Sequence, residues 1–378
     1  MTTSAIAAPR AGRFGPVRVW KIIISVAVLL LAYAIGPSVF LSACVGVLLW
    51  SIATGPAEHV LALALPIAFR LALAAGAFHF ETPTQIVDLA ERDIEPLSLF
   101  LAQDLWWPRY FVVYPSILVM DRWGMRFADA FALYCAAILP MSAMVLLAVV
   151  RVWRRLDELT ALAVGLGFAV LVAAIASQMN GRLIPAHIGM GIILLAQARI
   201  ISNAHVGARE GLLLCVGMVL SHMTSGTGLV AFAVVVAGSV LTVWLGIDRA
   251  LTLGLLWVLT ALFGPLLFSD LVKNLDYYGG GIGAVVTMLD HGPGVLLRRE
   301  PWTAPLALGA GAVVLLGLWR IRARLLAIPR ALWPSALAIP VTSIGGLYGF
   351  STLSMALPAV LVLLMSAVLG WTARARSA

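Results

Sequence analysis

The feature that most constrains this chain is a series of apolar runs, each about as long as a membrane-spanning helix. The first three lie at about residues 19–35, 38–55 and 58–79. A helix needs about 20 apolar residues to cross roughly 30 Å of hydrocarbon. Only 11% of the residues are charged, whereas soluble domains carry about 25%, so a soluble fold could not bury this much apolar surface. The sequence therefore predicts an all-α, polytopic integral membrane protein.

The apolar runs predict about twelve transmembrane helices, within a range of 10 to 13. Residues 109–121 are apolar but too short to span, and they predict a surface or re-entrant helix. We expect a basic cytoplasmic arm at 1–18, one transmembrane domain at 19–371 and a cytoplasmic tail at 372–378. The later spans are expected at about 127–150, 157–177, 183–201, 210–222, 227–246, 250–272, 303–319, 331–347 and 350–371, with outer loops at about 80–107 and 273–302.

The distribution of arginine and lysine predicts the orientation. If the N-terminus is cytoplasmic and the spans alternate, sixteen of these residues fall on the cytoplasmic side and eight on the other. This asymmetry follows the positive-inside rule, and it accounts for the net charge of +8 without a nucleic-acid partner. Both long polar loops and Arg182 then face outward.

Several functions are disfavoured by what the sequence lacks. It contains no Walker loop and no Rossmann glycine pattern, so nucleotide binding is not expected. Cys44, Cys135 and Cys215 lie in apolar runs without the spacing of metal ligands. We expect no cofactor and no metal. No acidic pair directly follows the first span, which disfavours a lipid-phosphosugar glycosyltransferase of the common multi-span type.

Two arginines in or beside the apolar runs are candidate binding residues, because charge in hydrocarbon is costly. Arg182 follows Asn180 and Gly181 at the outer edge of a span. Its guanidinium could bind a phosphate or extend into the interface. Arg70 is expected near mid-membrane or somewhat beyond, where it would face a protein-lined cavity or pair with a carboxylate such as Asp129 or Asp270.

His222 is the candidate catalytic residue inside a span. Ser221, Thr224 and Ser225 flank it, and the helix is expected to break directly after it. A broken helix at membrane depth is tolerated only where it is buried or lines a cavity. His222 could act as a general base near neutral pH or orient a sugar hydroxyl; the alternative is a histidine satisfied within the core.

The two polar loops supply further candidates. Asp88 and Glu91 lie on one face of a predicted helix, where a carboxylate could bind sugar hydroxyls or serve as catalytic base, or simply be solvated. In the second loop, Tyr277 and Tyr278 could stack on sugar faces. Two arginines near the next span, Arg298 and Arg299, could bind lipid phosphate or anchor that span.

The order of these parts resembles a known family. An acidic outward loop and a span are followed by Asn180-Gly181-Arg182-Leu183-Ile184-Pro185-Ala186, and then by a helix ending in Ser221-His222-Met223-Thr224-Ser225. Over about residues 80–230 this is similar to the bacterial Wzy-type polysaccharide polymerases, in their EpsG-like branch. The chain departs from the family pattern in having no polar residue directly after Arg182.

The resemblance implies polymerisation of polyprenyl-pyrophosphate-linked oligosaccharide repeat units at the outer face of the bacterial cytoplasmic (inner) membrane. Arg182, Arg70 and Arg298 would stabilise the departing pyrophosphate, and His222, Asp88 or Glu91 would deprotonate the acceptor hydroxyl. The partners would be the lipid-linked oligosaccharide, the bilayer and a chain-length regulator or export complex. The alternatives are a flippase for lipid-linked sugars, an O-antigen ligase-like transferase and a structural subunit of an export complex.

Overall fold

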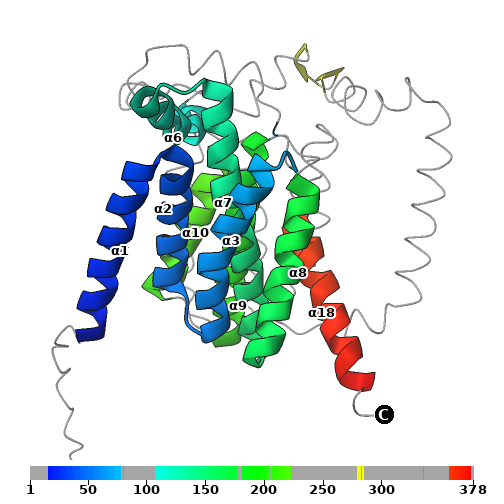
Figure 1. The fold of residues 1–378 in the computed structure, drawn as a ribbon. Helices are drawn as coiled ribbons and strands as arrows, with labels where there is room; N and C mark the ends of the chain where they lie inside the picture. Colours follow the sequence, from blue (N-terminus) through cyan, green and yellow to red (C-terminus); the bar gives the residue numbers. More distant parts are fainter. Residues whose placement is uncertain are drawn as a thin grey trace, which may run out of the picture.

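The computed structural model describes residues 16–77, 80, 107–176, 181–203, 207–222, 279–281, 283–284, 335 and 357–375. Within these ranges every regular element is a helix, as predicted (Figure 1). The predicted spans at 227–246, 250–272, 303–319 and 331–347, and most of both outer loops, lie outside the described residues. The elements are α1 (Pro16–Ile35), α2 (Pro37–Ile52), α3 (Pro56–Ala74), α6 (Trp107–Trp123), α7 (Phe127–Trp153), α8 (Glu158–Ala176), η1 (Gly181–Leu183), α9 (Ile184–Asn203), α10 (Ala208–His222) and α18 (Leu357–Ala375).

Most of the described helices are apolar, and several expose large apolar side chains, as the helices of membrane proteins do. Three of them, α3, α7 and α9, are long and apolar enough to cross a bilayer, and apolar stretches of α1, α2, α8 and α18 are somewhat shorter. Along α1 the large apolar side chains are exposed, with Leu30 at 67% and Leu31 at 65%. A soluble monomer rarely exposes so extensive an apolar surface. The chain is therefore a helical membrane protein.

Helix α7 lies at the centre of the bundle. It contacts α2, α3, α6, α8, α9 and α18 (Figure 1). Its side chains are buried over most of its length, including the bulky Phe131 and Leu147, which are fully buried. Because these side chains pack against helices on several sides, α7 is the element on which the register of the others depends.

Specific contacts show which helix ends lie together. Glu58, at the start of α3, pairs with Arg151, near the end of α7, so these helices are antiparallel. Gly181, just before α9, packs on Phe131 near the start of α7. The bundle thus has an Arg70 end, which contains the end of α3 and the starts of α7 and α9, and an Arg151 end opposite to it. With the predicted orientation, the Arg70 end faces outward.

The end of α3 corrects one expectation from the sequence. The predicted span ran to residue 79, but α3 ends at Ala74. Gly76 adopts φ +74, its N–H donates to the carbonyl of Leu73, and the N–H of Ala77 donates to Ala72. This is a Schellman C-cap, which favours glycine at the left-handed position. The apolar run continued through it, so composition alone placed the helix end too late.

Helices α9 and α10 approach each other closely through glycines. An added Cβ at Gly189 would lie 2.6 Å from the carbonyl oxygen of Gly217 and 2.7 Å from the backbone nitrogen of Ser221. These are backbone atoms that cannot rotate away. Close approach through small residues is a common basis of helix association in membranes, and here it holds the end of α10 beside the first turns of α9.

Substitution of Gly189 tests this packing. Gly189→Ala should lower the free energy of unfolding by about 1–3 kcal/mol, because overpacking forces the two backbones apart. Gly46→Ala is the matched control, since its added Cβ would lie 3.5 Å from the carbonyl oxygen of Ala62, an ordinary contact. Denaturation by sodium dodecyl sulfate in mixed micelles measures both variants. Equal stability of the two would contradict the close approach.

Candidate functional site

Arg70 lies closer to the end of its helix than the sequence suggested. It precedes the last residue of α3 by four positions, about 6 Å along the helix axis. The predicted span extended nine residues beyond Arg70, and the Schellman cap shortens this distance. An arginine near a helix end can extend its guanidinium along the helix toward that end.

The partners of Arg70 also differ from those expected. Its Nε donates to the Oγ of Ser38, at the start of α2, over 3.2 Å. Asp129 instead pairs with Arg126, with Oδ2 2.8 Å from Nε, so the predicted Arg70–Asp129 pair is wrong. Asp270 lies outside the described residues. Among the residues that the structure describes, no carboxylate pairs with Arg70, which is half-buried as a residue.

Arg182 lies in η1, the short turn that opens α9. The preceding residue, Gly181, fits against α7: an added Cβ would lie 2.8 Å from Sγ of Cys135 and 3.0 Å from Phe131. The Cys135 thiol donates to the carbonyl oxygen of Gly181 over 3.6 Å. Leu183 and Ile184 directly after it are buried. The backbone at Arg182 is thus held firmly between α7 and α9 at the Arg70 end.

His222 is the last described residue of α10 and lies at the same end of the bundle. Its neighbour Ser221 is fully buried and packs against Gly189 of α9. Gly189 follows Arg182 by seven residues, about 10 Å along the helix. Because α10 runs toward the Arg70 end, His222 lies nearer to that end than the contact with Gly189, and its backbone is less than two helical turns deeper than that of Arg182.

The other predicted site residues lie outside the described part of the chain: Asp88, Glu91, Tyr277, Tyr278, Arg298 and Arg299. The structure places Arg70, Arg182 and His222, three positions from different helical segments, at the same end of the bundle. Two guanidinium groups and an imidazole are chemically suited to an anionic substrate and to proton transfer.

An aromatic cluster at the Arg70 end was not anticipated. The rings of Tyr33 in α1, Phe40 in α2 and Trp123 in α6 lie with centroids 5.4 to 5.8 Å apart. Nε of Arg122 donates to the Tyr33 hydroxyl. The available sequence signal was the enrichment of tyrosine and tryptophan at membrane interfaces, but it does not show which rings meet.

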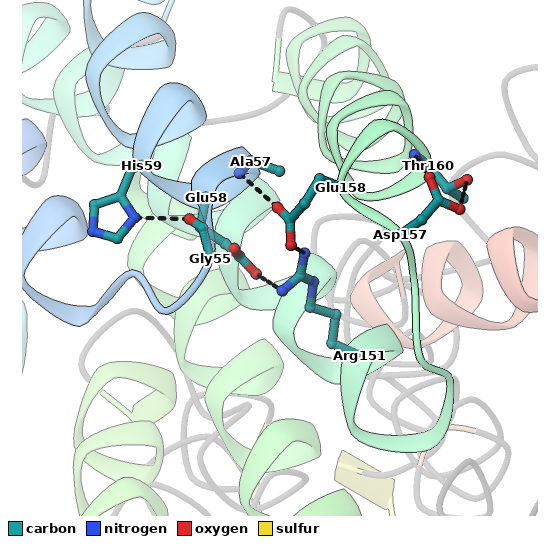
Figure 2. A network of polar contacts seen from close by, with 8 residues as sticks. All are labelled: Gly55, Ala57, Glu58, His59, Arg151, Asp157, Glu158 and Thr160. Carbon is teal, nitrogen blue, oxygen red and sulfur yellow. Dashed lines mark hydrogen bonds and ion pairs between the residues drawn. The ribbon is translucent and has the colours of Figure 1, made fainter.

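An ionic network at the Arg151 end was also missed (Figure 2). Nη1 of Arg151 lies 2.7 Å from Oε1 of Glu58, and Nη2 lies 3.3 Å from Oε1 of Glu158. The second oxygen of Glu158 accepts the N–H of Ala57 over 2.8 Å. Arg151 thereby joins the starts of α3 and α8 to the end of α7.

Gly55 leaves the space that this network needs. An added Cβ there would lie 2.5 Å from Oε2 of Glu58 and 3.0 Å from Nη1 of Arg151. Glu58 is only 7% exposed, and its Oε2 has no hydrogen-bond partner among the described residues. A buried carboxylate of this kind depends on its arginine. From the sequence, Arg151 was assigned only to the cytoplasmic side. The sequence signal for the network was Glu58, an acidic residue at a helix start just after Gly55-Pro56.

The loop between α7 and α8 completes this end with a helix cap. Asp157 accepts the N–H of Thr160 over 2.9 Å and its hydroxyl over 2.6 Å (Figure 2). These hydrogen bonds hold the pKa of Asp157 below its ordinary value, because they stabilise the ionised carboxylate. The cap satisfies a backbone donor that would otherwise be unpaired at the start of α8.

The described residues contain no group of three histidine, cysteine or acidic side chains arranged to hold a metal ion. Comparison of the chain with known proteins finds no relative: it matches no family model, no characterised protein and no solved structure.

Removal of the shared arginine tests the network. Arg151→Ala should lower the free energy of unfolding by about 3 kcal/mol, because it leaves the Glu58 carboxylate buried without its counter-charge. The control is Arg155→Ala, an exposed arginine in the loop after α7. Denaturation in mixed micelles compares the two, and an Arg151 variant as stable as the Arg155 variant would show that the network does not hold the helices.

Proposed function

We propose that this chain polymerises polyprenyl-pyrophosphate-linked oligosaccharide repeat units into a surface polysaccharide, exopolysaccharide or O-antigen. The protein would cross the bacterial cytoplasmic membrane many times and act at its outer face. The observation that supports the proposal is that the backbones of Arg70, Arg182 and His222 lie at one end of the bundle, the end that the charge distribution predicts to face outward. The resemblance of residues 80–230 to Wzy-type polymerases supports it.

The chemistry requires groups of this kind. The hydroxyl oxygen of the acceptor sugar forms a bond to the anomeric carbon of the growing chain, and the bond from that carbon to the pyrophosphate oxygen breaks. The pyrophosphate leaves with the electron pair, so positive donors that face it lower the barrier. Arginine suits this role because its planar fork binds phosphate oxygens in pairs.

Arg70 and Arg182 would both bind the departing pyrophosphate. Arg70 is held by one neutral hydroxyl, that of Ser38, and no described carboxylate neutralises its charge. The Arg182 backbone is fixed by the packing of Gly181 on α7. In this scheme His222 accepts the proton of the acceptor hydroxyl, with Asp88 and Glu91 as the alternative bases in the first outer loop.

A flippase for lipid-linked sugars would need the same cationic surface without the chemistry, and an O-antigen ligase-like transferase would use the same donor with a different acceptor. The glycans at the cell surface distinguish these functions. A polymerase mutant carries single repeat units, a flippase mutant carries none, and a ligase mutant accumulates polymer that stays on the carrier lipid.

Arg182→Ala should abolish long-chain polymer and leave single-unit glycans on the surface, because the departing pyrophosphate loses a donor. Gel electrophoresis of surface polysaccharide measures this, with the gene deletion as reference. Arg126→Ala is the matched control, since this arginine also lies at the Arg70 end and its side chain is 85% exposed. Loss of single units from the surface would instead indicate a flippase.

His222→Ala should slow chain growth by about 10²–10⁴-fold, the usual contribution of a general base, without loss of the protein from the membrane. His59→Gln is the control, because His59 lies at the Arg151 end, where its Nδ1 donates to the carbonyl of Gly55. Pulse-labelling of polymer measures the rate. If the His222→Ala variant made chains of wild-type length at the wild-type rate, His222 would not be the general base.

A further inference from the structure

The rings of the aromatic cluster at the Arg70 end do not stack face to face. The Tyr33 and Phe40 rings meet edge to face at 82°, and the Trp123 ring is tilted by 59° and 42° from them. None of the three pairs is parallel, so no ring covers the whole face of another. Tyr33 is 38% exposed, and Phe40 and Trp123 are partly exposed.

Arg122 adds hydrogen-bond donors to these apolar faces. Its guanidinium carbon lies 5.4 Å from the centroid of the Tyr33 ring, and its Nε donates to the Tyr33 hydroxyl. The Arg122 side chain is otherwise exposed. The cluster therefore combines flat π-surfaces with a fork of donors beside them.

The cluster and the hydrogen bond of Arg70 lie at the same end of α2. Tyr33 and Phe40 lie on either side of the turn at Gly36, and the hydroxyl of Ser38, in the first turn of α2, accepts the hydrogen bond from Arg70. Ser38 and Phe40 project from different sides of α2, because residues two apart in a helix do not face each other. A glycan attached to a phosphate at Arg70 would therefore cross the start of α2 to reach the aromatic rings.

We propose that Tyr33, Phe40, Trp123 and Arg122 form a carbohydrate subsite, which binds sugar units of the lipid-linked substrate that extend across the start of α2. This inference rests on the proposed function. The C–H groups on the face of a pyranose ring are weakly positive and pack on the negative face of an aromatic ring. The hydroxyls at the rim of the sugar accept hydrogen bonds from the arginine fork.

The competing role of the cluster is purely structural. Aromatic residues at a membrane edge often act as interfacial anchors, and Arg122 and Trp123 would then only fix α6 to α1 and α2. The two roles need different atoms. Sugar binding needs the Trp123 π-face, whereas an anchor needs its apolar volume and the bond from Arg122 to the Tyr33 hydroxyl.

The test is calorimetric titration of the purified full chain with oligosaccharides obtained by mild hydrolysis of the surface polysaccharide of the producing strain. Trp123→Leu keeps apolar volume and should weaken binding about tenfold, whereas Trp123→Phe should restore most of it. Tyr33→Phe keeps the ring and should bind within about twofold of wild type. The control is Trp20→Leu, an exposed tryptophan at the opposite end of α1.

Wild-type affinity in Trp123→Leu, or an equal loss in Trp20→Leu, would overturn the subsite. An interfacial anchor predicts a different pattern: Trp123→Leu would bind sugar with unchanged affinity, and Tyr33→Phe would have a lower free energy of unfolding. That pattern would also overturn the subsite. Titration needs no polymerisation, so the two proposals can fail separately. A normal polysaccharide ladder in the deletion strain would reject the polymerase. If the purified chain still bound sugar in a way that depends on Trp123, the subsite would stand.

Discussion

The shared ion pairs of Arg151 are the interaction on which the rest of the described bundle depends. Glu58 is almost fully buried in an apolar bundle, and an ionised carboxylate there is tolerated only with its counter-charge beside it. Because Arg151 comes from α7 while Glu58 and Glu158 come from α3 and α8, one guanidinium fixes three helix ends. The register set there determines where the opposite ends of the helices emerge.

Arg151 and Arg70, at opposite ends of the bundle, have different partners. Arg151 pairs with two carboxylates, and Gly55 beside it leaves no room for an inserted side chain. At the Arg70 end, Arg70 bonds only to a serine hydroxyl within the described structure, and Arg122 bonds to a phenol. Cations without a carboxylate beside them are suited to an external anion. In the proposed function, the Arg70 end would bind the substrate, and the Arg151 network would hold the helices that carry it.

Apolar run length predicted the helices well, but their ends and pairings only partly. The spans expected at 127–150 and 183–201 correspond to α7 and α9 within a few residues. The end of α3 was misplaced because the apolar run continues past Gly76, and only the glycine signalled the cap. The Tyr33–Trp123 contact and the Arg151 network join residues some ninety positions apart. Periodicity reports which face of a helix is apolar, but it does not identify the partner helix.

The most direct test of the proposed polymerase is reconstitution of the purified chain in liposomes with lipid-linked repeat units taken from a deletion strain. The quantities to measure are the length of the lipid-linked glycan and the amount of free polyprenyl pyrophosphate. A polymerase should release one carrier pyrophosphate for each repeat unit joined, without ATP. Movement of intact units across the bilayer, with no carrier released and no chain growth, would contradict the proposed polymerase.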